Sequence, residues 1–235
     1  MILRRVIAHF RKQEWTAIAL DFLIVVVGVF VGLQVNNWNE ARRDSALQEK
    51  LLERLEEEFR TLEPAVAELA AFAKTSYEST AGVIEALREE TPPKDEAAFR
   101  FALGRANWVQ NVPQAATSYT ELVSTGLLSE IRSIELRTAL IRYGDAHERV
   151  ERLYPAATSV IFSPQSNYYR AVEWNMNPDT WTDGSAIVSY DWDVLKSSRS
   201  EMQGWISFQY DLALYAEREL QEIRSIIAAI EDTAE

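Results

Sequence analysis

Residues 16–35 read TAIALDFLIVVVGVFVGLQV, and this run decides how the rest of the chain is interpreted. It holds a single charged residue, Asp21, and one amide. At a rise of about 1.5 Å per residue, a helix of this length is roughly 30 Å long, which matches the hydrocarbon core of a bilayer. Trp15 and Trp38 flank the run, and tryptophan is enriched at membrane interfaces. The sequence therefore predicts a transmembrane helix over residues 15–38.

A buried core helix and a cleaved signal peptide are the two alternatives for this run. Residues 22–33 carry no polar side-chain atom, which makes them too apolar on all sides for most helices of a small domain. A signal peptide needs small residues in an A-x-A pattern after the apolar run, whereas residues 34–38 read QVNNW. We therefore expect an uncleaved signal-anchor.

The stretch before the span, residues 1–14, is predicted to be a basic amphipathic tail on the cytoplasmic face of the membrane. Its apolar side chains share one helical face, and four basic residues interrupt them. Four Lys/Arg also follow the span closely, so the count of positive charges alone does not fix the orientation. Once residues 1–14 are set aside, 20 basic and 35 acidic residues remain, a balance of −15. We expect a cytoplasmic N-terminus and a periplasmic domain over residues 39–235.

Within the span, Gly28 and Gly32 form a G-x-x-x-G pair, a spacing that lets two helix backbones approach closely. Asp21 lies on the same stripe, and a carboxyl inside a membrane usually faces protein or water rather than lipid. Alternatively, Asp21 lies near the headgroups and stays hydrated. The candidate residues for association within the membrane are thus Asp21, Gly28 and Gly32, and the hydrated alternative remains open for the aspartate.

Beyond the span the hydrophobic pattern is that of helices. Apolar residues at spacings of three and four from Leu51 to Leu87 predict one helix that continues through Pro64 and stops near Pro92-Pro93. This phase fits a coiled-coil stalk as well as the first helix of a bundle. Further helices are predicted over 94–108, from Ser133, near 164–174 and from Ser198 onward. The predicted fold is all-α: one N-terminal transmembrane helix, then an antiparallel extramembrane helical bundle whose last helix packs on the first.

Two residue pairs have the spacing of a capping box, in which each side chain satisfies a backbone N–H of the other residue. The pairs are Ser118 with Glu121 and Ser198 with Glu201. They predict helix N-termini at both serines. Gly126 lies where the residue after a helix C-terminus is expected to be glycine.

Composition and motifs exclude several classes of site. The chain has no cysteine, so disulfides, thiolate metal sites and cysteine nucleophiles are ruled out. Of the two histidines, His147 has no second histidine at ligand spacing, which favours an exposed or capping residue over a zinc ligand. P-loop, dinucleotide and G-x-S-x-G motifs are missing, and the acidic balance disfavours nucleic acid. We predict no catalytic residue, no cofactor and no metal, and hence a protein that is not an enzyme.

Residues 174–193 mix aromatic and acidic side chains in a predicted irregular excursion of roughly 20 residues, and loops of that length tend to be functional or mobile. They can form a stacking platform for a sugar or peptide, or a calcium-binding loop, although the closing glutamate of an EF-hand is missing. The favoured alternative is that the aromatics close the open end of a helix bundle. The candidate ligand or partner residues are Trp174, Trp181, Tyr190, Asp191, Trp192 and Asp193.

Two blocks of the sequence carry a resemblance. Residues 14–42 read EWTAIALDFLIVVVGVFVGLQVNNWNEAR, and residues 118–143 read SYTELVSTGLLSEIRSIELRTALIRY. Through them the chain resembles a family of bacterial single-pass membrane proteins in which an N-terminal span ends in Asn-Trp-Asn-Glu and an external helical domain of unknown function follows. The resemblance implies a bacterial inner-membrane location and an all-α domain, and it supplies no activity and no site residues.

The favoured function is that of a membrane-anchored periplasmic interaction or structural protein. Its expected partners are the lipid bilayer and either a second copy of the chain or another membrane protein, to which it is an accessory subunit. The alternative is a ligand-sensing periplasmic bundle that signals through a partner, because the predicted cytoplasmic portion has only about 14 residues.

Overall fold

The computed structural model describes residues 15–177, 179 and 186–234 of the chain. The chain divides into two compact units, Met1–Leu51 and Leu52–Glu235. Within the described residues nearly all regular structure is helical, and the only strands form one short pair. The prediction of an all-α chain is therefore confirmed, with that small sheet as the exception.

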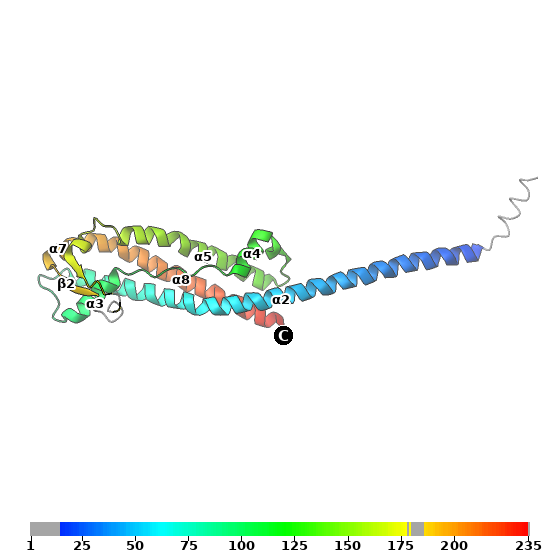
Figure 1. Cartoon of the computed structure of the whole chain (residues 1–235), viewed down its shortest axis with the longest axis horizontal. Helices are drawn as coiled ribbons and strands as arrows, with labels where there is room; N and C mark the ends of the chain where they lie inside the picture. The colour runs from blue at the N-terminus through cyan, green and yellow to red at the C-terminus, as the bar shows by residue number, and fades with distance from the viewer. Residues whose placement is uncertain (1–14, 178, 180–185, 235) are drawn as a thin grey trace, which may run out of the picture. The chain divides into compact units, whose positions relative to one another are not determined.

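The elements follow one another along the chain as labelled in Figure 1. They are α2 (Trp15–Ala86), α3 (Glu96–Ala106), α4 (Thr117–Thr125), the 3-10 helix η1 (Leu127–Glu130), α5 (Ile134–Ile161), α6 (Asn167–Ala171), β1 (Val172–Trp174), β2 (Ile187–Tyr190), α7 (Trp192–Ser197) and α8 (Arg199–Ala234).

In the first unit, α2 leaves its apolar side chains uncovered. Among the described residues it is the one helix long and apolar enough to cross a membrane, and none of its apolar window is buried. A core helix would be covered by its neighbours, so this surface argues against the buried alternative. No break separates the predicted span from the charged helix that follows, because α2 runs through the predicted boundary at 38/39 and includes Pro64.

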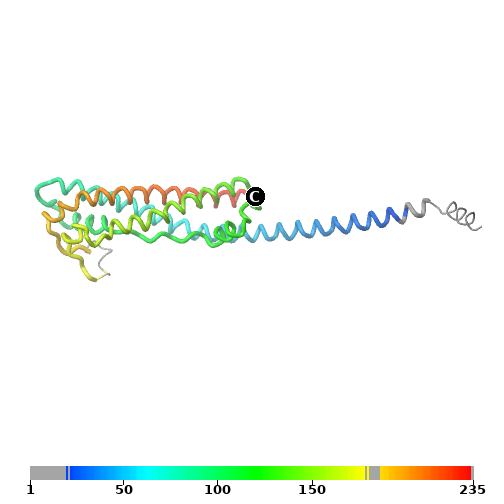
Figure 2. Tube along the Cα trace, turned by 90° about the horizontal axis from the view of Figure 1, so that it is seen from above, coloured from blue at the N-terminus to red at the C-terminus, as the bar shows by residue number. Residues whose placement is uncertain are grey.

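In the second unit, three helices lie side by side: α2 from Leu52 onward, α5 and α8 (Figures 1 and 2). Thr80 of α2 donates to Gln209 of α8 at 2.7 Å, whereas Glu63 pairs with Arg224 at 2.8 Å. Since the α8 number rises as the α2 number falls, these two helices run in opposite directions.

The core between these helices is built from one apolar face of each. Leu69 and Ala73 of α2 meet Val150 of α5 and Leu212 of α8 in the middle of the unit. A larger cluster lies toward α3, the sheet and α7, and contains the fully buried Tyr168 and Trp205. Full burial of a large apolar side chain is worth roughly 1.5–3 kcal/mol, so these two clusters hold the unit together.

The two-stranded sheet replaces part of what the sequence predicts as helix and loop. β1 pairs antiparallel with β2, with Val172 opposite Tyr190 and an irregular register after Glu173. The predicted helix near 164–174 is shortened to α6, and the predicted irregular excursion over 174–193 contains β2 and the start of α7. Strands of three or four residues are too short to show an alternation of apolar and polar side chains in the sequence. Their sequences, VEW and IVSY, are nevertheless rich in the β-branched and aromatic residues that favour strands.

The helix starts predicted at Ser118 and Ser198 hold to within one residue, since α4 begins at Thr117 and α8 at Arg199, but neither capping box forms. Helix α4 begins after Ala116, and the N–H and hydroxyl of Ser118 both donate to the Glu58 carboxylate of α2, each at 2.8 Å. The hydroxyl of Ser198 donates to the Leu195 carbonyl, at 2.6 Å. Neither serine needs the glutamate three residues later, because the available partners come from other elements.

Two other helix ends follow the local sequence. Gly126 adopts φ +76° at the end of α4, a conformation that favours glycine. Ser133 caps α5 by accepting from the Leu136 N–H at 3.1 Å. Pro155 lies inside α5, which continues to Ile161.

Candidate functional site

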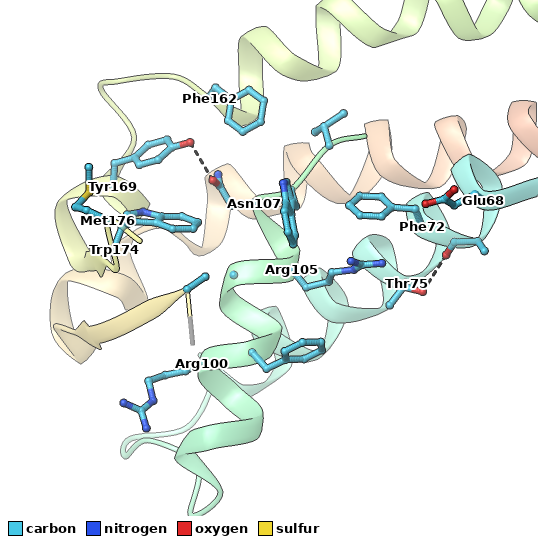
Figure 3. A pocket seen from close by; sticks show the side chains of 16 residues that line it. Glu68, Phe72, Thr75, Arg100, Arg105, Asn107, Phe162, Tyr169, Trp174 and Met176 are labelled. Atoms are coloured by element: carbon cyan, nitrogen blue, oxygen red, sulfur yellow. Dashed lines mark hydrogen bonds between the residues drawn. The ribbon is translucent and has the colours of Figure 1, made fainter. Parts of the chain in front are cut away.

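A cavity of about 860 Å³ lies in the second unit, and its size is that of small-molecule pockets. Its walls come from α2, from α3 and the segment after it, and from the region between α5 and β2 (Figure 3). The lining residues are Glu68, Ala71, Phe72, Thr75, Arg100, Phe101, Gly104, Arg105, Asn107, Trp108, Val109, Phe162, Tyr169, Trp174, Met176 and Ala186.

Local capping and contacts with neighbouring elements place α3 beside the cavity. Asp95 caps the start of α3 by accepting from the Ala98 N–H at 3.0 Å. At the other end, the side-chain amide of Asn107 donates to the Ile161 carbonyl at 3.3 Å, which fixes α3 to the end of α5. Gly104 faces the start of β2: a Cβ there would make an ordinary contact, 3.7 Å from Cγ1 of Ile187.

The walls of the cavity are mainly aromatic. The rings of Phe72 and Trp108 meet edge to face with centroids 6.0 Å apart. Tyr169 donates its hydroxyl to Asn107 at 2.9 Å, so its ring is held at the cavity wall by a polar contact. Phe101 and Met176 remain 45 % and 84 % exposed, which leaves apolar surface open to a ligand.

Arg105 brings a positive charge into this apolar space. Its Cζ lies 3.9 Å from the centre of the Phe72 ring, and Figure 3 shows the side chain directed toward Phe72 and Thr75. Its Nε is buried and has no hydrogen-bond partner among the described residues. Burial lowers the pKa of the guanidinium, because a charged group loses hydration there.

The other two charged residues of the wall are placed differently. Arg100 donates from its guanidinium to the Val188 carbonyl at 3.0 Å and so is engaged by β2. Glu68 is exposed on α2. Within the described part of the chain neither Glu68 nor any other carboxylate forms a salt bridge with Arg105.

A second polar cluster lies between α5 and α8. His147 is only 5 % exposed, and its Nδ1 lies 2.8 Å from Oε1 of Glu219, which is 1 % exposed. The prediction of an exposed or capping histidine is therefore wrong. Burial by itself lowers the pKa of His147, but the hydrogen bond and negative charge of Glu219, together with Glu151, raise it above its ordinary value. The described residues contain no group of three or more acidic or histidine side chains that could hold a metal.

The six candidate residues of the excursion are not brought together in one site. Trp174 lines the cavity. Tyr190 and Trp192 pack edge to face on Phe99, with centroids 5.3 and 5.7 Å away, and Trp192 donates from its indole to the Glu90 carbonyl at 3.0 Å. These two side chains thus belong to the packing around the end of the helices. Trp181 lies outside the described residues.

The two acidic candidates, Asp191 and Asp193, lie at the start of α7. Asp191 caps this helix, since its carboxylate accepts from the Val194 N–H at 3.0 Å. Asp193 is exposed in the first turn of α7, where a negative charge suits the helix dipole.

The predicted association stripe lies on α2. A Cβ added at Gly28 or Gly32 would meet nothing within 4 Å, so the helix surface at both is open. Asp21 is in the same helix, and its side chain lies outside what the structure describes.

The cavity residues of α2 and α3 were missed because both helices read as ordinary amphipathic helices. One signal was available for Arg105: it follows Phe101 by four residues and precedes Trp108 by three, so a cation lies on an aromatic face. Comparison of the chain with protein-family models, curated proteins and solved structures gives no match. The resemblance to single-pass membrane proteins therefore stays a prediction.

Proposed function

We propose that the protein is a membrane-anchored binding protein whose helical bundle takes a small organic ligand in the cavity beside α3. The cavity is the observation that carries this proposal. Its volume of about 860 Å³, its aromatic walls and the few polar groups among them have the character of a ligand site. The ligand-sensing alternative raised by the sequence is thereby favoured over a purely structural role.

The anchor in this proposal is the apolar part of α2, inserted in a bacterial inner membrane with the N-terminus cytoplasmic and the antiparallel bundle periplasmic. The uncovered apolar surface of residues 22–33 supports insertion, because such a surface is unfavourable in water. The four basic residues before the span support the orientation, together with the acidic balance of −15 after residue 14, which keeps the excess of positive charge off the periplasmic side.

The test of ligand binding uses the full chain in lipid nanodiscs. A panel of small aromatic acids, alcohols and amines is screened by ligand-observed NMR, with empty nanodiscs as the lipid control. We expect saturable binding that is lost in Ala71→Phe, where a ring is added from an exposed position of α2 that lines the cavity. The matched variant Ala228→Phe adds the same ring at an exposed position of α8 away from the cavity and should bind as wild type does. Failure of every compound to bind above the lipid control contradicts the proposal.

Self-association through the span is a second candidate function, favoured by the open helix surface at Gly28 and Gly32. Native mass spectrometry of the detergent-solubilised chain should show an oligomer that dissociates in Gly28→Ile and Gly32→Ile. Val26→Ile, on the opposite side of the helix, is the control and should remain oligomeric. A monomeric wild-type chain that copurifies with no other membrane protein contradicts this candidate.

A further inference from the structure

We propose that the ligand of the cavity is an organic acid, whose single carboxylate binds the guanidinium of Arg105 while its apolar body lies against the aromatic walls. This assignment rests on the proposed binding function and names the chemical class of the ligand.

The guanidinium of Arg105 carries a positive charge that no carboxylate of the described residues pairs with. Within the described residues Arg105 forms no salt bridge, its Nε is buried without a hydrogen-bond partner, and one face of the guanidinium is covered by the Phe72 ring. The side chain is partly buried, and an opposite charge with hydrogen bonds offsets the hydration that a charged group loses there. A ligand carboxylate supplies both, because a guanidinium donates two parallel hydrogen bonds to it.

The charged residues of the cavity wall bear on how many negative charges the ligand carries. Arg100, the other cation of the wall, is engaged by the Val188 carbonyl. Glu68 contributes a negative charge to the same wall and opposes additional negative charge on a ligand. The wall holds two cations and one carboxylate, a balance of +1, which favours a monoanion over a phosphate or a dicarboxylate.

The aromatic walls of the cavity indicate what the apolar body of the ligand is. The rings of Phe72, Trp108 and Tyr169 line the cavity, and Phe101 leaves 45 % of its surface exposed there. Each Å² of apolar surface removed from water is worth about 25 cal/mol, so a ring or branched hydrocarbon gains most from this wall. The geometry therefore fits an acid with a bulky apolar body.

The experiment compares three probes that share one ring system and differ in charge: 2-naphthylacetate, 2-(2-naphthyl)ethanol and 2-(2-naphthyl)ethylamine. Binding to the full chain in nanodiscs is measured by isothermal titration calorimetry, with empty nanodiscs subtracted. We expect the carboxylate to bind about tenfold or more tightly than the alcohol, the size of one charge-assisted interaction, and the amine to bind most weakly. In Arg105→Gln the advantage of the carboxylate over the alcohol should disappear, and in Glu68→Gln the carboxylate should bind more tightly.

The outcomes distinguish an error in the assigned ligand class from an error in the proposed binding function. Tighter binding of the alcohol or the amine than of the carboxylate, or a carboxylate preference that survives Arg105→Gln, overturns the assignment and leaves the binding function standing. Absence of binding by all three probes overturns the assignment as well. A melting temperature of Arg105→Gln at or above that of wild type shows that the variant is folded. If it is lower, Arg105→Lys serves in its place and should keep a reduced carboxylate preference.

Discussion

At the scale of single residues, the buried pair of His147 and Glu219 makes stability depend on pH. The carboxylate raises the pKa of His147 above its ordinary value of 6.5, against the opposing effect of burial. A group whose pKa is higher in the folded than in the unfolded chain contributes its full stability below the unfolded pKa. That contribution is lost as the pH rises through the folded pKa. We therefore expect the melting temperature of the full chain to fall above pH 6.5 relative to that of His147→Gln, measured by circular dichroism in matched buffers. Parallel curves for the two proteins contradict this prediction.

Removing one member of the pair tests its energetic role. His147→Leu leaves the carboxylate of Glu219, which is 1 % exposed, without its cation, and we expect a loss of about 3–5 kcal/mol in unfolding free energy. His147→Leu combined with Glu219→Leu removes both buried charges, and should be more stable than the single variant. Urea titration of all forms gives the coupling energy, and additive losses would show that the pair does not interact.

Two glycines within helices make a matched test of packing. A Cβ at Gly144 of α5 would clash with the hydroxyl of Tyr119, whose ring packs edge to face on Tyr143 at 5.0 Å. A Cβ at Gly82 of α2 meets nothing within 4 Å. Alanine favours the helix by about 1 kcal/mol in both places, but overpacking costs about 1–3 kcal/mol at the first. Gly82→Ala should therefore raise the melting temperature and Gly144→Ala should lower it. Equal shifts in the two variants contradict this account.

At the scale of elements, two short helices, α4 and α6, receive N-terminal contacts from the long ones. Glu58 of α2 accepts two hydrogen bonds from Ser118 of α4, and Glu201 of α8 accepts from Ser166 and Asn167 at the start of α6. Burial would raise the pKa of Glu58, but the hydrogen bonds from Ser118 and Arg54 lower it below 4.5. The stability it contributes is present above that pH and is lost as the pH falls.

Glu58→Ala removes the contact that holds the start of α4. We expect a loss of about 1–2 kcal/mol in unfolding free energy, the size of a lost helix cap, and faster hydrogen exchange at the Ser118 amide. Glu57→Ala, one residue earlier and exposed, is the control and should leave both quantities unchanged. Unchanged exchange at Ser118 in Glu58→Ala would contradict the assigned role of this carboxylate.

These contacts also explain which elements were predictable from sequence. The helix through Pro64, the start of a helix at Ser133 and the glycine at 126 depend on neighbours in sequence, and the structure confirms them. The capping box at Ser118 does not form because local spacing does not reveal a carboxylate 60 residues away. The cavity is harder still, since its walls come from five separate stretches of chain. Among its lining residues the sequence predicts only Trp174 as a candidate site residue, because it belongs to the aromatic and acidic stretch 174–193.

At the scale of the whole molecule, the remaining proposal is which side of the membrane the bundle faces. The orientation rests on the acidic balance of −15 after residue 14 and on the basic residues before the span. Because the chain has no cysteine, a single introduced thiol reports its own accessibility without background. Ser225 is exposed on α8, whereas Ala216 of the same helix is fully buried.

In a Gram-negative host, a small membrane-impermeant maleimide should label Ser225→Cys in intact cells, because the proposed orientation puts α8 in the periplasm. Gln13→Cys, which precedes the span, should react only after the inner membrane is permeabilised. Ala216→Cys should react only after denaturation, and this control shows that the labelled bundle is folded. Labelling of Gln13→Cys but not Ser225→Cys in intact cells would reverse the orientation. A ligand would then have to reach the cavity from the cytoplasm, so this measurement also decides in which compartment organic acids should be sought.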